Sequence, residues 1–178
     1  VVLYPMEAKN RRTERRIDII DALSSRYNFE VREILDLSNY ETRDMFLEGT
    51  GSMVMDHKNR IIYACRSSRT NLKVLSDLVK RINYVSVTFN AIDRSGDPIY
   101  HTNVMINIGE ELAIVCLDSV SLIDEKNSLL ESLKANNGEV LLLSLAQMEA
   151  FAGNMLELES LNGESLLIMS EQARESLD

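Results

Sequence analysis

The chain contains the sequence Glu48-Gly49-Thr50-Gly51-Ser52-Met53-Val54-Met55, in which a carboxylate and two glycines precede a short apolar strand. Two further apolar stretches begin with a polar residue at the same interval of 53 residues, at His101 and at Asn154. A repeat of this length builds one supersecondary unit several times. Equivalent strand starts face the same end of such an assembly. We therefore expect the carboxylate, the imidazole and the amide to share one site.

The two complete repeats have the same predicted order of elements, strand–strand–helix–strand. Apolar residues at helical spacing mark each helix, and Asp, Asn and Gly mark the turns. The Asn-Asn-Gly sequence at 136–138 predicts a left-handed end to the second helix. In chain order, the predicted elements are strands 52–55 and 60–65, helix 69–82 and strand 84–89, then strands 104–108 and 112–117, helix 121–135 and strand 140–144.

Both ends of the chain are predicted to be incomplete units of one α/β domain. The elements predicted there are strand 1–5, helix 10–27 and strand 31–37, then strands 154–158 and 165–169 around Asn162-Gly163, and a helix from Ser170. The units would span about 1–45, 46–96, 97–150 and 151–178. Because folded proteins avoid unpaired strand edges, roughly three units of a larger closed ring are expected.

The composition is that of an ordinary globular protein, with 45% hydrophobic and 26% charged residues in a chain of 178. No apolar run approaches the roughly 20 residues of a membrane helix. The net charge of −9 disfavours a nucleic-acid partner. Cys65 and Cys116 are predicted to be buried thiols, which favours a reducing, cytoplasmic compartment. The start at Val1, without an initiator methionine or a signal peptide, predicts a partial chain.

Four charged or titratable side chains could do chemistry. Glu48 and His101 would form the carboxylate–imidazole pair that commonly transfers protons, although each alone is more often structural. Arg11 and Arg69 lie near predicted helix starts, where an arginine can grip a carboxylate in fork geometry or simply be a surface residue. His57 lies in a predicted hairpin turn and is expected to be solvated. No His/Cys spacing fits a zinc site, and no phosphate loop is visible.

Four motifs, taken in order, resemble the guanidino-modifying enzymes of the pentein superfamily: arginine deiminases, amidinotransferases and dimethylarginine dimethylaminohydrolases. The resemblance is strongest to the citrulline-utilisation hydrolases of the amidinotransferase-like branch. It implies a five-bladed α/β propeller of ββαβ units with the active site in a central channel. The motifs are Val2-Leu3-Tyr4-Pro5-Met6 with Asn10-Arg11-Arg12, Phe46-Leu47-Glu48-Gly49-Thr50-Gly51-Ser52, His101-Thr102-Asn103-Val104-Met105, and Phe151-Ala152-Gly153-Asn154-Met155-Leu156.

The resemblance also implies roles for single residues. Glu48 matches the family's acid and His101 its catalytic histidine, while Arg11 and Arg69 match the arginines that hold the substrate α-carboxylate. Asn103 and Asn154 are predicted to bind substrate. Gly51 replaces the second acid of the family motif, and Asn103 replaces an aspartate. Because a neutral ureido group can accept an amide partner, these changes favour citrulline over arginine.

The family nucleophile is a cysteine near the C-terminus, which neither Cys65 nor Cys116 matches. The resemblance therefore implies a hydrolase for the non-peptide C–N bonds of citrulline or arginine, with the cysteine outside these residues, and the 178 residues alone are expected to be inactive. The implied mechanism needs no metal or organic cofactor. Three alternatives stay open: an amidinotransferase, a non-catalytic relative that acts as a binding module, and a ligand-sensing or structural repeat domain whose polar strand starts are only caps. The sequence leaves the substrate, including a methylated arginine, and the oligomeric state undecided.

Overall fold

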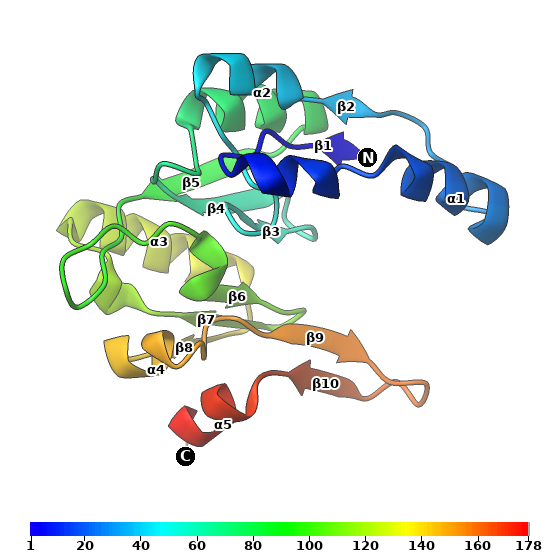
Figure 1. The fold of residues 1–178 in the computed structure, drawn as a ribbon. Coiled ribbons are helices and arrows are strands. Elements are labelled where there is room, and N and C mark those ends of the chain that lie inside the picture. The colour runs from blue at the N-terminus through cyan, green and yellow to red at the C-terminus, as the bar shows by residue number, and fades with distance from the viewer. Residues whose placement is uncertain (178) are drawn as a thin grey trace.

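Small sheets and helices alternate along the computed structural model, which describes residues 1–177 (Figure 1). Two complete units have the same element order. In each, the first two strands pair antiparallel and the second and third pair parallel. The units are β3 (Val54–Asp56), β4 (Ile61–Cys65), α2 (Leu72–Ile82) and β5 (Val85–Phe89), then β6 (Ile106–Ile108), β7 (Leu112–Val115), α3 (Ile123–Asn136) and β8 (Glu139–Leu142).

Shorter elements flank these units. The N-terminal strands form a two-stranded parallel sheet, and the C-terminal strands form an antiparallel hairpin whose turn contains Gly163 at φ +80°. Figure 1 shows the units following one another from the blue N-terminal end to the red C-terminal end. The elements are β1 (Val2–Leu3), α1 (Ile17–Tyr27) and β2 (Leu35–Asp36), then α4 (Leu145–Glu149), β9 (Leu156–Glu159), β10 (Ser165–Ile168) and α5 (Glu171–Leu177), with 3-10 helices at Lys9–Glu14, Ser38–Arg43, Thr102–Val104 and Leu117–Ser119.

The strand β4 organises the core, because all five of its residues are buried. Successive side chains of a strand point to opposite faces. Ile61, Tyr63 and Cys65 accordingly join one apolar cluster with Leu129 and Leu133 of α3. Ile62 and Ala64 join a second cluster with Val74, Leu75 and Leu78 of α2. The sheet of β3, β4 and β5 is thus covered on one face by α2 of its own unit and on the other by α3 of the next unit. Across the contact with α3, the Tyr63 hydroxyl lies 3.0 Å from Ser132 Oγ.

Local sequence fixes both ends of α2. The Asn71 side chain accepts hydrogen bonds from the amides of Lys73 (3.0 Å) and Val74 (3.4 Å), which satisfies donors that a helix start leaves unpaired. Asn83 ends the helix in the left-handed conformation at φ +58°. The helix therefore begins at Leu72, three residues later than the predicted start at Arg69.

The N-terminal prediction of one helix over 10–27 is wrong. The structure has a 3-10 helix over Lys9–Glu14 and then α1, separated by Arg15 and Arg16 in non-helical conformations. Arg15 Nη1 donates to the Tyr4 carbonyl and pairs with the Glu41 carboxylate, and these contacts hold the chain out of the helix. The predicted strands 1–5 and 31–37 shrink to two residues each in β1 and β2.

Three further expectations are corrected. Asn137 is extended, with φ −124° and ψ 148°, so the end of α3 is not left-handed. Gly138 is needed for a different reason: a Cβ there would lie 2.9 Å from the Glu111 carbonyl oxygen. The short helix α4 was not predicted, although Ser144 and Gln147 form a capping box at its start. Finally, none of the three polar residues opens a strand. Glu48 precedes the turn before β3, His101 precedes the 3-10 helix Thr102–Val104, and Asn154 lies two residues before β9.

The mixed α/β class is confirmed. The described residues form four separate sheets, and none of these closes on itself, so the five-unit ring stays a prediction. Within residues 1–177, no helix has the length and apolar character needed to cross a membrane.

Replacing Asn71 by alanine should destabilise the protein by about 1 kcal/mol, since two amides at the start of α2 lose their acceptor. Chemical denaturation measures this change. Asn127→Ala is the matched control, because Asn127 is exposed in the interior of α3. Equal stability of the two variants would contradict the assigned cap.

Candidate functional site

Glu48 is a buried carboxylate at the start of a tight turn. Its side chain has no exposed surface, and the Glu48 amide donates to Ser52 Oγ at 2.8 Å across the turn. Ser52 Oγ in turn donates to the Arg69 carbonyl at 2.5 Å. Gly49 adopts φ +58°, a conformation that suits glycine, and it packs against the Tyr4 ring. This turn therefore fixes the carboxylate relative to the segment that carries Arg69.

His101 meets that carboxylate from the third unit. Its Nε2 lies 2.8 Å from Glu48 Oε2, and its side chain is 15% exposed. The next residue, Thr102, is fully buried and anchors the loop. Its hydroxyl donates to the Ser52 carbonyl at 2.6 Å and accepts from the Cys65 amide at 2.9 Å. The two predicted partners therefore lie together, as the repeat suggested.

Gly51 allows this close approach. A Cβ on Gly51 would lie 2.9 Å from two atoms of the His101 ring, closer than side chains tolerate. The main-chain amide of Asn103 also donates to the Gly51 carbonyl at 3.3 Å. A side chain at position 51 would therefore collide with the His101 ring in its present position.

Both predicted arginines also contact Glu48. Arg11 Nη1, from the 3-10 helix, lies 3.2 Å from Glu48 Oε2, and Arg69 Nη1 lies 3.3 Å from the same atom. Each arginine has a second carboxylate: Glu14 for Arg11 and Glu7 for Arg69. Arg11 and Arg69 are about one-third exposed, at 36% and 30%. One buried oxygen is therefore shared by three potentially cationic side chains.

These contacts control the ionisation of Glu48. Burial alone would raise the pKa of this carboxyl, but hydrogen bonds from His101 and from the Glu7 amide, with the charge of Arg69, hold the pKa below its usual value. Glu48 is accordingly ionised, and its two oxygens accept N–H groups from the residues around it.

Asn103 and Asn154 line a different hollow from the one that Glu48 and Arg11 line. They line a hollow of about 450 Å³ together with Thr50 and Ile106. Glu48 and Arg11 line a different hollow of about 390 Å³ with Tyr4 and, again, Thr50. Thr50 therefore borders both hollows. Four of the six predicted residues are divided between the two hollows, whereas His101 and Arg69 line neither.

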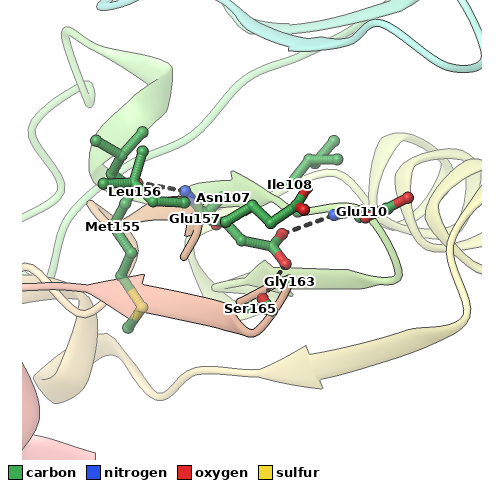
Figure 2. Close-up of a pocket in the computed structure, with 11 residues that line it drawn as sticks. Asn107, Ile108, Glu110, Met155, Leu156, Glu157, Gly163 and Ser165 are labelled. Atoms are coloured by element: carbon green, nitrogen blue, oxygen red, sulfur yellow. Dashed lines mark hydrogen bonds between the residues drawn. The ribbon is translucent and has the colours of Figure 1, made fainter. Parts of the chain in front are cut away.

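A further hollow of about 390 Å³ lies between β6 and the hairpin of β9 and β10 (Figure 2). Its polar groups are paired with one another. Glu157 accepts from the Glu110 amide at 2.7 Å and from the Ser165 hydroxyl, and Asn107 Nδ2 donates to the Met155 carbonyl at 2.6 Å. None of the predicted site residues lines this hollow, so it is not the candidate site.

Neither cysteine has the surroundings of a reactive thiol. Cys65 and Cys116 are both free and have no exposed surface. Burial raises the pKa of Cys65 to about 11, and burial also raises the pKa of Cys116. Among the residues that the structure describes, no group of three or more His, Cys, Asp or Glu side chains is arranged to hold a metal ion.

Sequence reasoning missed three residues next to the cluster. The main-chain amide of Glu7 donates a hydrogen bond to Glu48, and the Glu7 carboxylate forms an ion pair with Arg69. Nothing in the local sequence of Glu7 indicates these contacts. Thr102 and Tyr100 flank His101 in sequence, and this adjacency was an available signal. The Tyr100 ring lies 4.8 Å from the His101 ring, and the Arg69 guanidinium lies 5.2 Å from the Tyr100 ring centroid.

Residues 1–178 match the family model described as N,N dimethylarginine dimethylhydrolase, eukaryotic. The chain belongs to this family. The resemblance to guanidino-modifying pentein enzymes is thereby confirmed. No curated protein matches the chain at a significant level.

Solved structures similar to this family member share its fold. The cyanobacterial arginine dihydrolase ArgZ superposes with a TM-score of 0.68 at 16% identity, over 99% of this chain and 26% of that one. The N-terminal domain of ArgZ, bound to substrate, gives 0.68 at 18% identity, over 99% and 59%. The dimethylarginine hydrolase of Pseudomonas aeruginosa, complexed with citrulline, gives 0.53 at 13% identity, over 98% and 58%. The chain thus spans less than two thirds of each of these structures.

The stability contributed by Glu48 should depend on pH. A carboxyl whose folded-state pKa lies below its unfolded value of 4.5 stabilises the fold above that value, and this contribution is lost as the pH falls through the lowered pKa. The free energy of unfolding of the native protein, minus that of Glu48→Gln, should therefore decrease as the pH is lowered from about 6 to about 3. Urea denaturation at several pH values measures it. A difference independent of pH would contradict the assignment.

Proposed function

We propose that this chain forms the acid–base and substrate-carboxylate part of a hydrolase that cleaves a non-peptide C–N bond of citrulline or arginine. The observation that supports it most strongly is the 2.8 Å contact between Glu48 Oε2 and His101 Nε2, made between two units of the repeat. An imidazole oriented by an ionised carboxylate is suited to transfer protons. The family to which the chain belongs is named for hydrolysis of a substituted arginine.

The substrate would bind by its two ends. Arg11 and Arg69 would hold the α-carboxylate, since a guanidinium matches a carboxylate in geometry and charge. Glu48 would accept N–H groups of the ureido or guanidino end. Asn103 and Asn154, which border the neighbouring hollow, would contact the same end. With glycine at position 51, the cluster offers one acid at this point of the motif, which suits the neutral ureido group of citrulline better than a guanidinium.

The chemistry would proceed through a covalent intermediate. A cysteine thiolate supplied by sequence other than residues 1–178 would attack the ureido or guanidino carbon. His101 would protonate the leaving nitrogen and then take a proton from the attacking water. For citrulline the products would be ornithine, ammonia and carbon dioxide. The ligand-bound ArgZ domain and the citrulline complex of the Pseudomonas enzyme are both cysteine-to-serine variants, which supports a cysteine in this role.

Hydrolysis is favoured over amidino transfer because the matching family and the similar structures are named as hydrolases and dihydrolases. A non-catalytic binding module would have no need of a buried, paired carboxylate and imidazole. We accordingly treat the chain as one partial domain of a small-molecule enzyme without a nucleic-acid or membrane partner, and a cytoplasmic location stays a prediction.

The two histidines offer a matched test of the mechanism. His101→Asn should lower ammonia release from citrulline or arginine by about 10²- to 10⁴-fold, the usual contribution of a positioned acid–base group. His57→Asn should change the rate far less than His101→Asn. His57 also lines the hollow of Asn103 and Asn154, but its described hydrogen bond goes to the Tyr84 hydroxyl and not to the Glu48 cluster.

The assay uses the longest native form of the protein that contains these 178 residues. Equal activity of the His101 and His57 variants would contradict the proposal, as would turnover by residues 1–178 alone, since neither of their cysteines is suited to be the nucleophile.

A further inference from the structure

Arg69 is engaged before any ligand arrives. Its Nε lies 3.0 Å from Glu7 Oε2 and its Nη1 lies 3.3 Å from Glu48 Oε2, while its guanidinium lies over the Tyr100 ring. The Ser68 hydroxyl donates to the same Glu7 oxygen at 3.2 Å. A ligand carboxylate that approaches Arg69 therefore meets a carboxylate already bound there.

Hydrogen bonds hold the main chain of Glu7 in place, whereas its side chain is partly exposed and contacts Arg69 and Ser68 near the surface. The Glu7 amide donates to Glu48 Oε1 at 2.9 Å, and the preceding amide, of Met6, donates to Glu41 Oε1 at 2.8 Å. Two successive amides are thus fixed on two carboxylates from other segments. The Glu7 side chain is 36% exposed, so a rotation into solvent could release Arg69 without moving the backbone.

We propose that Glu7 is a specificity-determining residue, an internal carboxylate that competes with the α-carboxylate of the ligand for Arg69. This inference rests on the proposed function, in which Arg69 holds that carboxylate. A ligand must displace Glu7 from Arg69 before its carboxylate can bind there. The apparent affinity of the ligand is therefore lower than its intrinsic affinity, because only molecules in which the Glu7–Arg69 pair is open can bind it. Ion pairs exposed to this degree have small effects, so the expected reduction is about twofold to fivefold.

Two pairs of ligands, each with and without the α-carboxylate, isolate the contribution of that carboxylate to binding. L-Arginine and L-citrulline carry it, whereas agmatine and 4-aminobutylurea are the same molecules without it. Glu7→Gln keeps the main-chain contact to Glu48 and removes the charge. We expect this variant to bind arginine and citrulline about twofold to fivefold more tightly and to bind the two carboxylate-free ligands unchanged, by isothermal titration calorimetry.

Glu30→Gln is the matched control, since it removes the same charge from an exposed pair with Arg32 that makes no contact with the cluster. It should change no affinity. The inference is overturned if Glu7→Gln leaves the affinity for arginine and citrulline unchanged, or if it tightens all four ligands equally. Glu7→Ala repeats the test with a second side chain, and failure of both Glu7 variants to fold would assign Glu7 a structural role and also overturn the inference.

Arg69→Gln separates this inference from the proposed function. If Arg69→Gln weakens arginine and citrulline more than their carboxylate-free counterparts, the role of Arg69 stands, and only the results for Glu7 decide the inference. If Arg69→Gln weakens all four ligands equally, or if none of them binds the native protein, the proposed function is contradicted and the inference is overturned with it.

Discussion

A carboxylate without exposed surface must be compensated by hydrogen bonds and opposite charge, and the structure around Glu48 follows from this requirement. Its two oxygens receive the Glu7 amide, Arg11, Arg69 and His101, which come from three separate segments of the chain. The turn at 48–52 and the anchored Thr102 set the geometry, and Gly51 gives the imidazole room. The site is therefore held together by one ionised group shared between neighbouring repeat units.

The balance of charges around Glu48 also determines which ligands the site can bind. Three potentially cationic side chains surround Glu48, and two more carboxylates, Glu7 and Glu14, occupy the outer edges of the arginines. Without a ligand, the charges of the cluster largely satisfy one another. A ligand with a carboxylate at one end and N–H donors at the other could replace these internal contacts like for like. A zwitterionic amino acid with a ureido or guanidino end group has both features.

Sequence reasoning succeeded where the signal was local or repeated. The sequence predicted three features that the structure contains: the helix α2, the hairpin at Asn162-Gly163 and the proximity of Glu48 and His101. It failed where distant contacts decide. The helix predicted over 10–27 is interrupted because Arg15 pairs with Glu41. Glu7 pairs with Arg69, which is distant in the sequence. No pattern in the sequence reveals that Asn103 and Asn154 line one hollow while Arg11 and Glu48 line another, with Thr50 bordering both.

A crystal structure of the protein with L-citrulline tests the central claim most directly. If Glu48 is the point on which the site is built, the ureido nitrogens will lie within about 3 Å of its oxygens, and the ligand carboxylate will lie on Arg69 or Arg11. Citrulline bound elsewhere, for example beside Glu157 in the hollow of Figure 2, with the contacts of Glu48 unchanged, would contradict it.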